Sequence, residues 1–374
     1  FGMTSYKTGA WLFFVSKMLG ASVRIFLVVL TMQLLVFDPL GLPFLLNVLM
    51  TVLFVWIYTF FGGVKSIVSV DVLKTICLIA SVALSIVFIA KGLCLDFGGV
   101  VTTIRESRMS RVFFFDDIND KRFFWKQFLA GAFTMVATTG LDQDMMQRNL
   151  SCKSDTEARR NMIVSSVFQF FVIALFLMLG VLLYTYAEQM GIRLPESSDQ
   201  VFPFLATGDF FPEIVGILFI IGLVAAAFPA AGSALTALTT SFTIDILGAK
   251  EKEEKRLEKT RKWVHVGMAL LMGLCIIAFE ILNNTSVINA VYVLASYTYG
   301  PLLGLFTFGI ISGRRVRDRL IPIVVILSPI LCYILDRYSV EWFCGYHFSY
   351  EILIINALFT MLGLLICSHK AAKA

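Results

Sequence analysis

The sequence predicts an all-α protein that crosses a membrane many times, and three observations lead to this fold class. Hydrophobic residues make up 58% of the 374 residues, charged residues make up 15%, and the mean hydropathy is +0.83. Soluble globular domains carry about 25% charged residues, so this composition excludes a soluble enzyme or binding domain. The third observation is a series of ten long apolar segments, because a membrane-spanning helix needs about 20 mainly apolar residues.

The ten apolar segments follow one another along almost the whole chain. They cover residues 9–38, 41–61, 66–92, 123–141, 160–187, 208–248, 262–281, 285–311, 319–335 and 350–368. Segment 208–248 is too long for a simple span, so we expect its ends to project from the membrane or the helix to bend at Pro229. The mixed-charge segment 249–262 is expected to form a solvated helical extension, and a regulatory docking site is the alternative.

The positions of Lys and Arg predict the orientation of the chain. Alternating the ten helices places most of the cations on one side: Lys7, Lys65, Arg148, Lys153, Arg159, Arg160, the cluster in 250–262, Arg314, Arg315, Arg317, Arg319, Lys370 and Lys373. Cytoplasmic loops carry such an excess, so this side is expected to be cytoplasmic, with a bacterial inner membrane as the simplest location. Topology thus explains the net charge of +5, and nothing indicates a nucleic-acid partner.

Cysteine and histidine give no sign of an enzyme. The seven cysteines lack metal-ligand spacing, and the three histidines fall in separate segments without a nucleophile motif. Cys94 and Cys344 are expected on the outer side, where one disulfide is an alternative to two free thiols. No cofactor other than a transported or coupling ion is expected.

Small and hydroxyl-bearing residues are concentrated in segment 222–248. They are Ala225, Ala226, Ala230, Ala231, Gly232, Ser233, Thr236, Thr239 and Thr240. Such residues allow close backbone approach, and their hydroxyls can bind a neighbouring helix, an ion or water. A tightly packed buried helix is the alternative interpretation.

Four stretches together carry a family resemblance. They are YTFFGGVKSIVSVDVLK at 58–74, GLDQDMMQRNLSCKSDTEARR at 140–160, the small-residue helix that ends in SFTIDILG, and YTYGPLLGLFTFGI at 297–310. In this order and spacing, the chain resembles the sodium:solute symporter family, which includes sodium/glucose, sodium/proline and sialic acid transporters. The resemblance implies the inverted-repeat fold of the leucine transporter, with two five-helix repeats around a substrate near the membrane midplane.

On that fold, the ten segments correspond to core helices three to ten and to two helices that follow. The resemblance thus implies one transmembrane domain, with a partial first repeat at 1–92, the second repeat at 123–311 and two additional helices at 312–374. The first two core helices have no counterpart, and the chain begins with Phe1. We therefore expect a fragment, or a protein that has lost its start.

The resemblance also implies a sodium site on the eighth core helix. The family uses a backbone carbonyl at an alanine and the hydroxyls of an adjacent pair three residues later. Counted back from Asp245, these positions are Ala226, Pro229 and Ala230, so both hydroxyls are absent here. Hard cations need several oxygen ligands. The site is therefore expected to be weakened, although Pro229 leaves a carbonyl near residue 225 without its helical donor.

A second sodium site, found in some family members, is half retained. Asp71 corresponds to its aspartate and Ser233 to one of its serines, whereas Gly232 replaces the other serine. A carboxylate in an apolar segment needs a partner. Lys74, one turn later, would make this a structural salt bridge, and an ion is the alternative.

Substrate contacts are implied in the sixth and seventh core helices. Thr138 and Thr139 match the family's gate, which is often aromatic, and so suggest a smaller or more polar contact. Gln169 matches a substrate-binding position of some sugar transporters, and an interhelical hydrogen bond is its alternative role. The polar turn 142–144 is expected to shape the inner gate.

Two further places carry candidate pocket residues. Tyr297 and Thr298, with Tyr299, are pocket or gate candidates, and an interhelical aromatic cluster is their alternative role. Arg24 is a cation inside the first apolar segment, so we expect it to face the protein interior. A carboxylate-bearing substrate or Asp71 would be its partner.

These observations predict a secondary active transporter that moves a small polar organic solute by alternating access, with a weakened or altered sodium site. Proton coupling through Asp71 and facilitated transport are alternatives to sodium coupling. A membrane solute sensor or scaffold that has lost transport is the alternative from another functional class. The substrate and the oligomeric state are left open.

Overall fold

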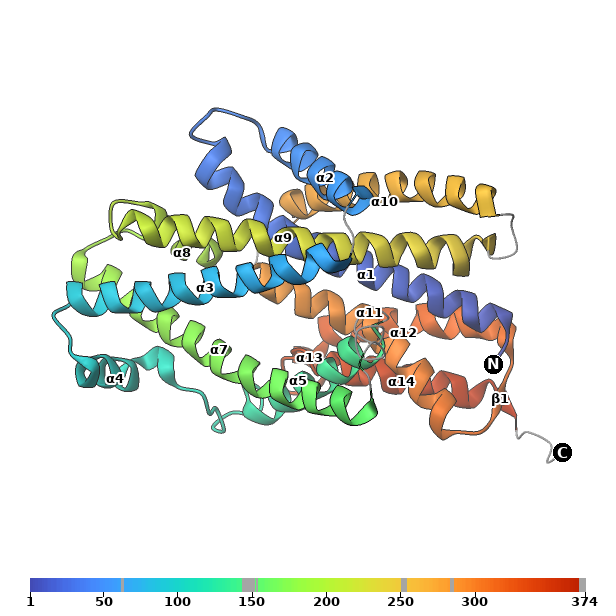
Figure 1. Cartoon of the computed structure of the whole chain (residues 1–374). Coiled ribbons are helices and arrows are strands. Elements are labelled where there is room, and N and C mark those ends of the chain that lie inside the picture. The colour runs from blue at the N-terminus through green and yellow to red at the C-terminus, as the bar shows by residue number, and fades with distance from the viewer. Residues whose placement is uncertain (62–63, 143–151, 153, 250–253, 283–285, 370–374) are drawn as a thin grey trace.

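The computed structural model describes residues 1–61, 64–142, 152, 154–249, 254–282 and 286–369, without the side chains of 61, 64–69 and 71. The chain forms a bundle of long helices that run roughly along a common direction (Figure 1). Its elements are α1 (Met3–Met32), η1 (Gln33–Phe37), α2 (Phe44–Phe61), α3 (Val64–Gly92), α4 (Phe97–Glu106), η2 (Arg108–Ser110), α5 (Phe124–Gly140), α7 (Asp155–Met190), α8 (Ser198–Thr207), α9 (Glu213–Ser241), η3 (Phe242–Ile246), α10 (Glu254–Leu282), α11 (Val287–Ile311), β1 (Arg315–Val316), η5 (Asp318–Leu320), α12 (Ile321–Arg337), α13 (Ser339–Trp342), α14 (Ile352–Ile366) and β2 (Ser368–His369).

The all-α membrane fold class is confirmed. Each of the ten predicted segments contains a helix, and seven helices of the described chain are long and apolar enough to cross a membrane. α2, α5 and α14 are shorter. The sequence missed the short helices α4, α8 and α13, which lie in the connections. The predicted helical extension before residue 262 is present, because α10 begins at Glu254.

Segment 208–248 does not break at Pro229, the place where a bend was one of the two expectations for its length. α9 begins after Pro212 and passes through Pro229 as one continuous helix. Its winding changes only at Phe242–Ile246, where a π-helical turn follows. Proline is tolerated inside a membrane helix when neighbouring groups satisfy the freed backbone.

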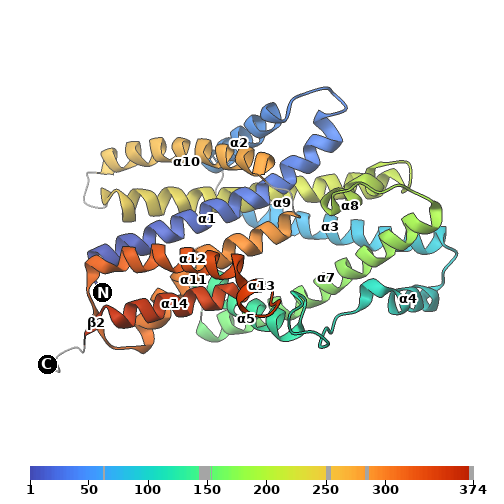
Figure 2. The ribbon, with the colours of Figure 1, turned by 180° about the vertical axis from the view of Figure 1, so that it is seen from behind.

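The N-terminus and β2, the last element that the structure describes, lie at the same end of the bundle (Figure 1 and, from behind, Figure 2). The backbone N–H groups of Thr4 and Ser5 donate to the Asp318 carboxylate at 2.8 and 2.7 Å. At this end Tyr6 also donates to Asp245, and β1 pairs with β2. The start of α1, the end of α9, the α11–α12 connection and β2 therefore share one side, as the alternation of the helices predicts. Arg148, Lys153, Lys370 and Lys373 lie outside the described residues.

α9 is the central helix because it belongs to two of the hydrophobic cores. One core joins it to α1, α2 and α10, and the other joins it to α3, α7 and α8. Gly222 of α9 allows α3 to come close, since a Cβ at Gly222 would lie 2.8 Å from the Leu78 side chain. Nearby, the Ser81 hydroxyl donates to the Val215 carbonyl at 3.2 Å. α5, α12 and α14 pack in two further clusters with most of α11, whose Val287 belongs to the first core.

Candidate functional site

The sodium-site positions predicted on α9 divide between two faces of the helix. Ala226 and Ser233 are half-buried and Ala230 is exposed, and the same face continues to the half-buried Thr240. Their spacing is that of one side of an α-helix. Pro229 lies off this face and is buried. α9 therefore presents a face of small and hydroxyl-bearing residues that the rest of the described chain leaves partly open.

The polar groups available on this face are few. The Ser233 hydroxyl donates to the Ala230 carbonyl at 3.3 Å, and its oxygen lone pairs remain available to a cation. Gly232 has a packing role, because a Cβ there would lie 2.8 Å from Cγ2 of Thr59 on α2. A serine in place of Gly232 would collide with α2. The side chain of Asp71 lies outside the described part of the structure.

The threonines predicted for the substrate gate lie near the end of α5. Thr138 and Thr139 are both half-buried, and the Thr138 hydroxyl donates to the Thr134 carbonyl at 2.8 Å. Gln169 lies on α7, where residues 159–171 are all exposed. The described residues do not enclose Gln169, so its role in substrate binding stays a prediction.

Tyr297 and Thr298 point into different surroundings. The Tyr297 hydroxyl donates to Asp336 of α12 at 3.3 Å, and the Thr298 hydroxyl donates to the Leu294 carbonyl at 2.7 Å. Tyr297 thus makes an interhelical contact with a carboxylate, so its role in a pocket or gate, or in an aromatic cluster, stays a prediction. Tyr299 is buried.

Arg24 is exposed on α1, whereas the sequence led us to expect it inside the protein. The reason is local, because its neighbours Val23 and Ile25 occupy the core-facing side of the helix. Arg24 and Asp142 each lie within electrostatic range of the Tyr299 hydroxyl. Arg24 therefore lies beside a buried polar region rather than in it.

A buried ion pair that the sequence analysis missed holds this polar region together. Lys17 Nζ of α1 lies 2.7 and 2.9 Å from the two carboxylate oxygens of Asp142, and both residues are only 8% exposed. The sequence predicted that Asp142 shapes the inner gate, but it did not predict Lys17 as its partner. The signal was present in the sequence, since a lysine inside an apolar helix needs an acidic partner. Gln143 and Asp144 lie outside the described residues.

His265 forms a second buried polar contact that the sequence did not reveal. Its ring nitrogens lie 2.9 Å from the Thr59 hydroxyl and 3.0 Å from the Thr239 hydroxyl. The imidazole thereby bridges α2, α9 and α10 inside the bundle. Both threonine hydroxyls also lie within hydrogen-bonding distance of carbonyls of their own helices. A neutral or a charged ring can therefore be satisfied by turning one hydroxyl.

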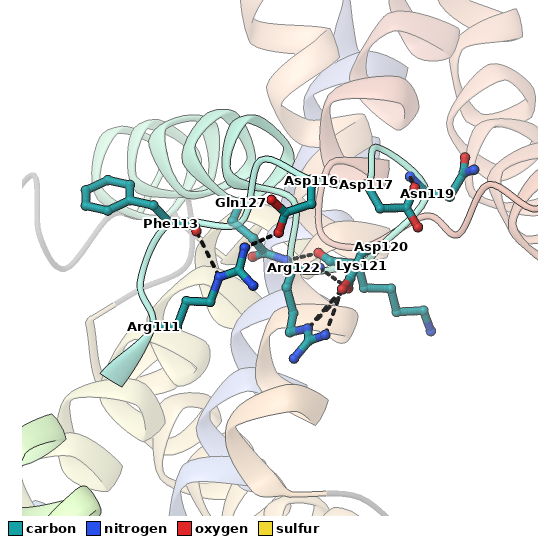
Figure 3. A network of polar contacts seen from close by, with 9 residues as sticks. All are labelled: Arg111, Phe113, Asp116, Asp117, Asn119, Asp120, Lys121, Arg122 and Gln127. Carbon is teal, nitrogen blue, oxygen red and sulfur yellow. Dashed lines mark hydrogen bonds and ion pairs between the residues drawn. The ribbon is translucent and has the colours of Figure 1, made fainter. Parts of the chain in front are cut away.

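The connection before α5 carries an exposed polar network (Figure 3). Arg111 pairs with Asp116, and Arg122 Nη2 lies 2.8 Å from Asp120. Hydrogen bonding from Arg122 lowers the pKa of Asp120 to about 2. Gln127 donates to the Lys121 carbonyl at 2.6 Å and to Ser349 at 2.8 Å, which ties this connection to the one before α14.

The hydrogen bonds and ion pairs of this exposed network stabilise the loop, and they do not form a metal centre. In the part of the chain that the structure describes, no group of three or more His, Cys, Asp or Glu side chains is arranged to hold a metal ion. Cys94 and Cys344 are both free thiols. The disulfide considered for them is therefore absent.

Comparisons with known proteins agree with this architecture. The sodium/sialic acid symporter NanT of Aliivibrio fischeri is 25% identical over 79% of this chain and 58% of its own length. The mouse sodium-coupled monocarboxylate transporter 1 is 25% identical over 68% of this chain and 42% of its own. The human sodium/iodide cotransporter is 24% identical over 72% of this chain and 43% of its own length. The chain thus spans about two fifths to three fifths of these relatives.

A solved structure of a Na+-coupled sialic acid symporter, in a substrate-bound outward-open state, has the same fold. The TM-score is 0.75 at 19% identity, and the match covers 97% of this chain and 75% of the other. This likeness establishes the leucine-transporter-like inverted-repeat fold. The model of the sodium:solute symporter family matches residues 7–318. The chain therefore belongs to the sodium:solute symporter family.

Proposed function

We propose that this protein is a secondary active transporter that moves a small polar organic solute across the membrane by alternating access. The family and the fold support this proposal. The names of the relatives include transporters of sialic acid, monocarboxylates and iodide. A small polar solute is the class that covers most of them. We place the protein in a bacterial inner membrane, with the side that carries most of the cations in the cytoplasm.

The domain division that we propose follows the inverted repeat. Residues 1–92 belong to the first repeat, residues 123–311 form the second repeat, and residues 312–374 add two helices. α9, the central helix, then lies within the second repeat and is followed there by α10 and α11. Its partly open face is the place where ion and solute would meet the second repeat.

The observation that carries the proposal is the chemistry of the α9 face. Ala226, Ala230 and Ser233 share this face, but only Ser233 brings a side-chain oxygen. Pro229 is buried away from it. We therefore propose a sodium site that is weaker than the family's main site, since a hard cation needs several oxygen ligands.

The packing of α3 against α9 favours the second site as the one that remains. The contacts of Leu78 with Gly222 and of Ser81 with Val215 define an antiparallel register. Two helical turns from the first contact, along both helices, lead to residue 71 of α3 and to Pro229 of α9. Counted from the two contacts, residue 71 is thus level with the Ala225–Pro229 stretch, about one helical turn before Ser233. We propose that Asp71 and Ser233 supply the ion ligands, with a proton on Asp71 as the alternative.

The experiment is ion-dependent thermal stabilisation of the purified full-length protein. Sodium is compared with potassium and choline at constant ionic strength, because a ligand of the native state raises apparent stability by mass action. A sodium-specific shift that Asp71→Ala and Ser233→Ala remove, and that Thr240→Ala leaves in place, would support the proposed site. Ala230→Ser returns one hydroxyl to the face and is expected to enlarge the sodium shift.

Solute uptake into proteoliposomes separates the remaining interpretations. Sodium-driven uptake is the expected result. Uptake driven by a pH gradient, with no sodium shift, would transfer the coupling role to a proton on Asp71. A protein that binds solute but moves none under any gradient would overturn the proposal in favour of a sensor or scaffold.

A further inference from the structure

One face of α10 carries a continuous stripe from its charged beginning into its apolar part. Arg256, Lys259, Thr260 and Trp263 line a shallow depression on this face. Their spacing is three, four and seven residues from the first, so they lie on one side of the helix. The stripe continues with Gly267, Leu270 and Leu274, which are all exposed.

The order of residue types along this stripe matches the layers of one membrane leaflet. The cations come first, the Trp263 side chain is 71% exposed at the transition, and Leu270 and Leu274 follow at 59% and 63%. Tryptophan is enriched at membrane–water interfaces. No atom lies within 4 Å of the Cβ position at Gly267, so this glycine leaves a notch between the interfacial and apolar parts.

The two cations of the stripe are available for a ligand. Among the described residues, neither Arg256 nor Lys259 has an acidic partner, whereas Lys262 on the adjacent face pairs with Glu258 at 2.7 Å. The stripe also begins at the end of the bundle where the N-terminus and β2 lie (Figure 1 and Figure 2). This is the end that carries Arg314, Arg315, Arg317 and Arg319 in the α11–α12 connection.

We propose that this stripe of α10 binds an anionic phospholipid. The headgroup phosphate is held by Arg256 and Lys259, and one acyl chain lies over Gly267 and along Leu270 and Leu274. A cation pair at a membrane surface attracts anionic headgroups. The apolar continuation of the same face selects a lipid over a soluble phosphate, because only a lipid contacts both parts at once.

The experiment is native mass spectrometry of the full-length protein in detergent with added phosphatidylglycerol or phosphatidylcholine. We expect phosphatidylglycerol to be retained and phosphatidylcholine to be lost. The double variant Arg256→Gln/Lys259→Gln should weaken phosphatidylglycerol binding about 25-fold, roughly fivefold for each cation. Arg256→Gln alone should weaken it about fivefold, whereas the matched control Arg261→Gln removes one charge from the opposite side of α10 and should leave binding nearly unchanged.

Two further arms separate lipid binding from nonspecific charge attraction and from a soluble anion site. Gly267→Leu keeps every charge but fills the notch, and it should also weaken phosphatidylglycerol binding. Inorganic phosphate and glycerol phosphate should not compete with the lipid. Equal losses in Arg256→Gln and Arg261→Gln would show that the effect is nonspecific charge attraction, and competition by inorganic phosphate would show a soluble anion site. Either result would overturn the proposal.

Discussion

Helices α7 and α11 are both apolar and long enough to cross a membrane, yet they are enclosed to very different degrees. α7 contains the more hydrophobic stretch of the two, but only 22% of that stretch is buried, against 56% for α11. Hydrophobicity therefore does not decide which helix is enclosed by others. In a membrane, lipid tails solvate an apolar side chain as well as a protein neighbour does.

Small residues and hydrogen bonds account for the difference. Gly300 and Gly304 bring α11 so close to α14 that a Cβ at either glycine would lie 2.6 Å from an atom of α14. Asn356 of α14 is fully buried, donates to the Ser296 and Tyr297 carbonyls, and accepts from Ser328 at 2.6 Å. The exposed part of α7, at 159–171, carries large apolar side chains and no glycine.

The largest expected effect comes from the ion pair next to α11. Lys17→Met removes the cation that lies 2.7 and 2.9 Å from the two oxygens of the buried Asp142 carboxylate, and we expect a loss of about 3 to 5 kcal/mol in the free energy of unfolding. Thermal or detergent unfolding of the purified protein measures it. Arg24→Met is the matched control on α1 and should cost less than about 1 kcal/mol, because Arg24 is exposed. Equal losses in both variants would contradict the role given to burial.

A glycine pair tests close packing directly. Gly304→Ala places a methyl group against the Ala357 carbonyl, so α11 and α14 must separate, at a cost of about 1 to 3 kcal/mol. The same change in α7, Gly180→Ala, meets no atom within 4 Å and should be neutral or slightly stabilising. The comparison between the helices fails if the two variants unfold at the same temperature.

Replacing buried polar groups should have a smaller effect. Asn356→Leu removes two donated hydrogen bonds and leaves Ser328 without its side-chain acceptor, so we expect a loss of about 1 kcal/mol. Gln169→Leu on the exposed part of α7 should leave stability unchanged. If Gln169→Leu nevertheless reduces solute uptake, the polar role proposed for this residue in the pocket gains support.

The smallest effect is expected in the exposed loop, where water replaces lipid as the surroundings. The pKa of Asp120 is lowered from 3.8 to about 2, chiefly by hydrogen bonding from Arg122. A lowered pKa means that the contribution of this pair to stability is present above about pH 3.8 and is lost as the pH falls toward 2. An NMR titration of the Asp120 carboxyl carbon measures the pKa directly. Arg122→Gln should return the midpoint toward its ordinary value, and an unchanged midpoint would rule out this pairing.

Much of the fold could be predicted from the sequence, because apolar length determines where a membrane helix can form. The ten segments, the side that carries the cations and the family resemblance all follow from composition and order along the chain. The partners of polar residues could not be predicted in the same way. Lys17 and Asp142 lie 125 positions apart, and His265 meets threonines from two other helices. Only the packing of the helices determines which polar groups meet.

The short helix α8 has a consequence for motion in this bundle. Asp199 of α8 accepts a hydrogen bond at 2.8 Å from the backbone N–H of Val287, the first residue of α11. The carboxylate thus caps α11 from outside its own segment and also meets the positive end of the helix dipole. A tilt of α11 must either carry α8 with it as one rigid body or break this bond. Slow hydrogen exchange at the Val287 amide in every state of the cycle would mark α8 and α11 as a single moving part.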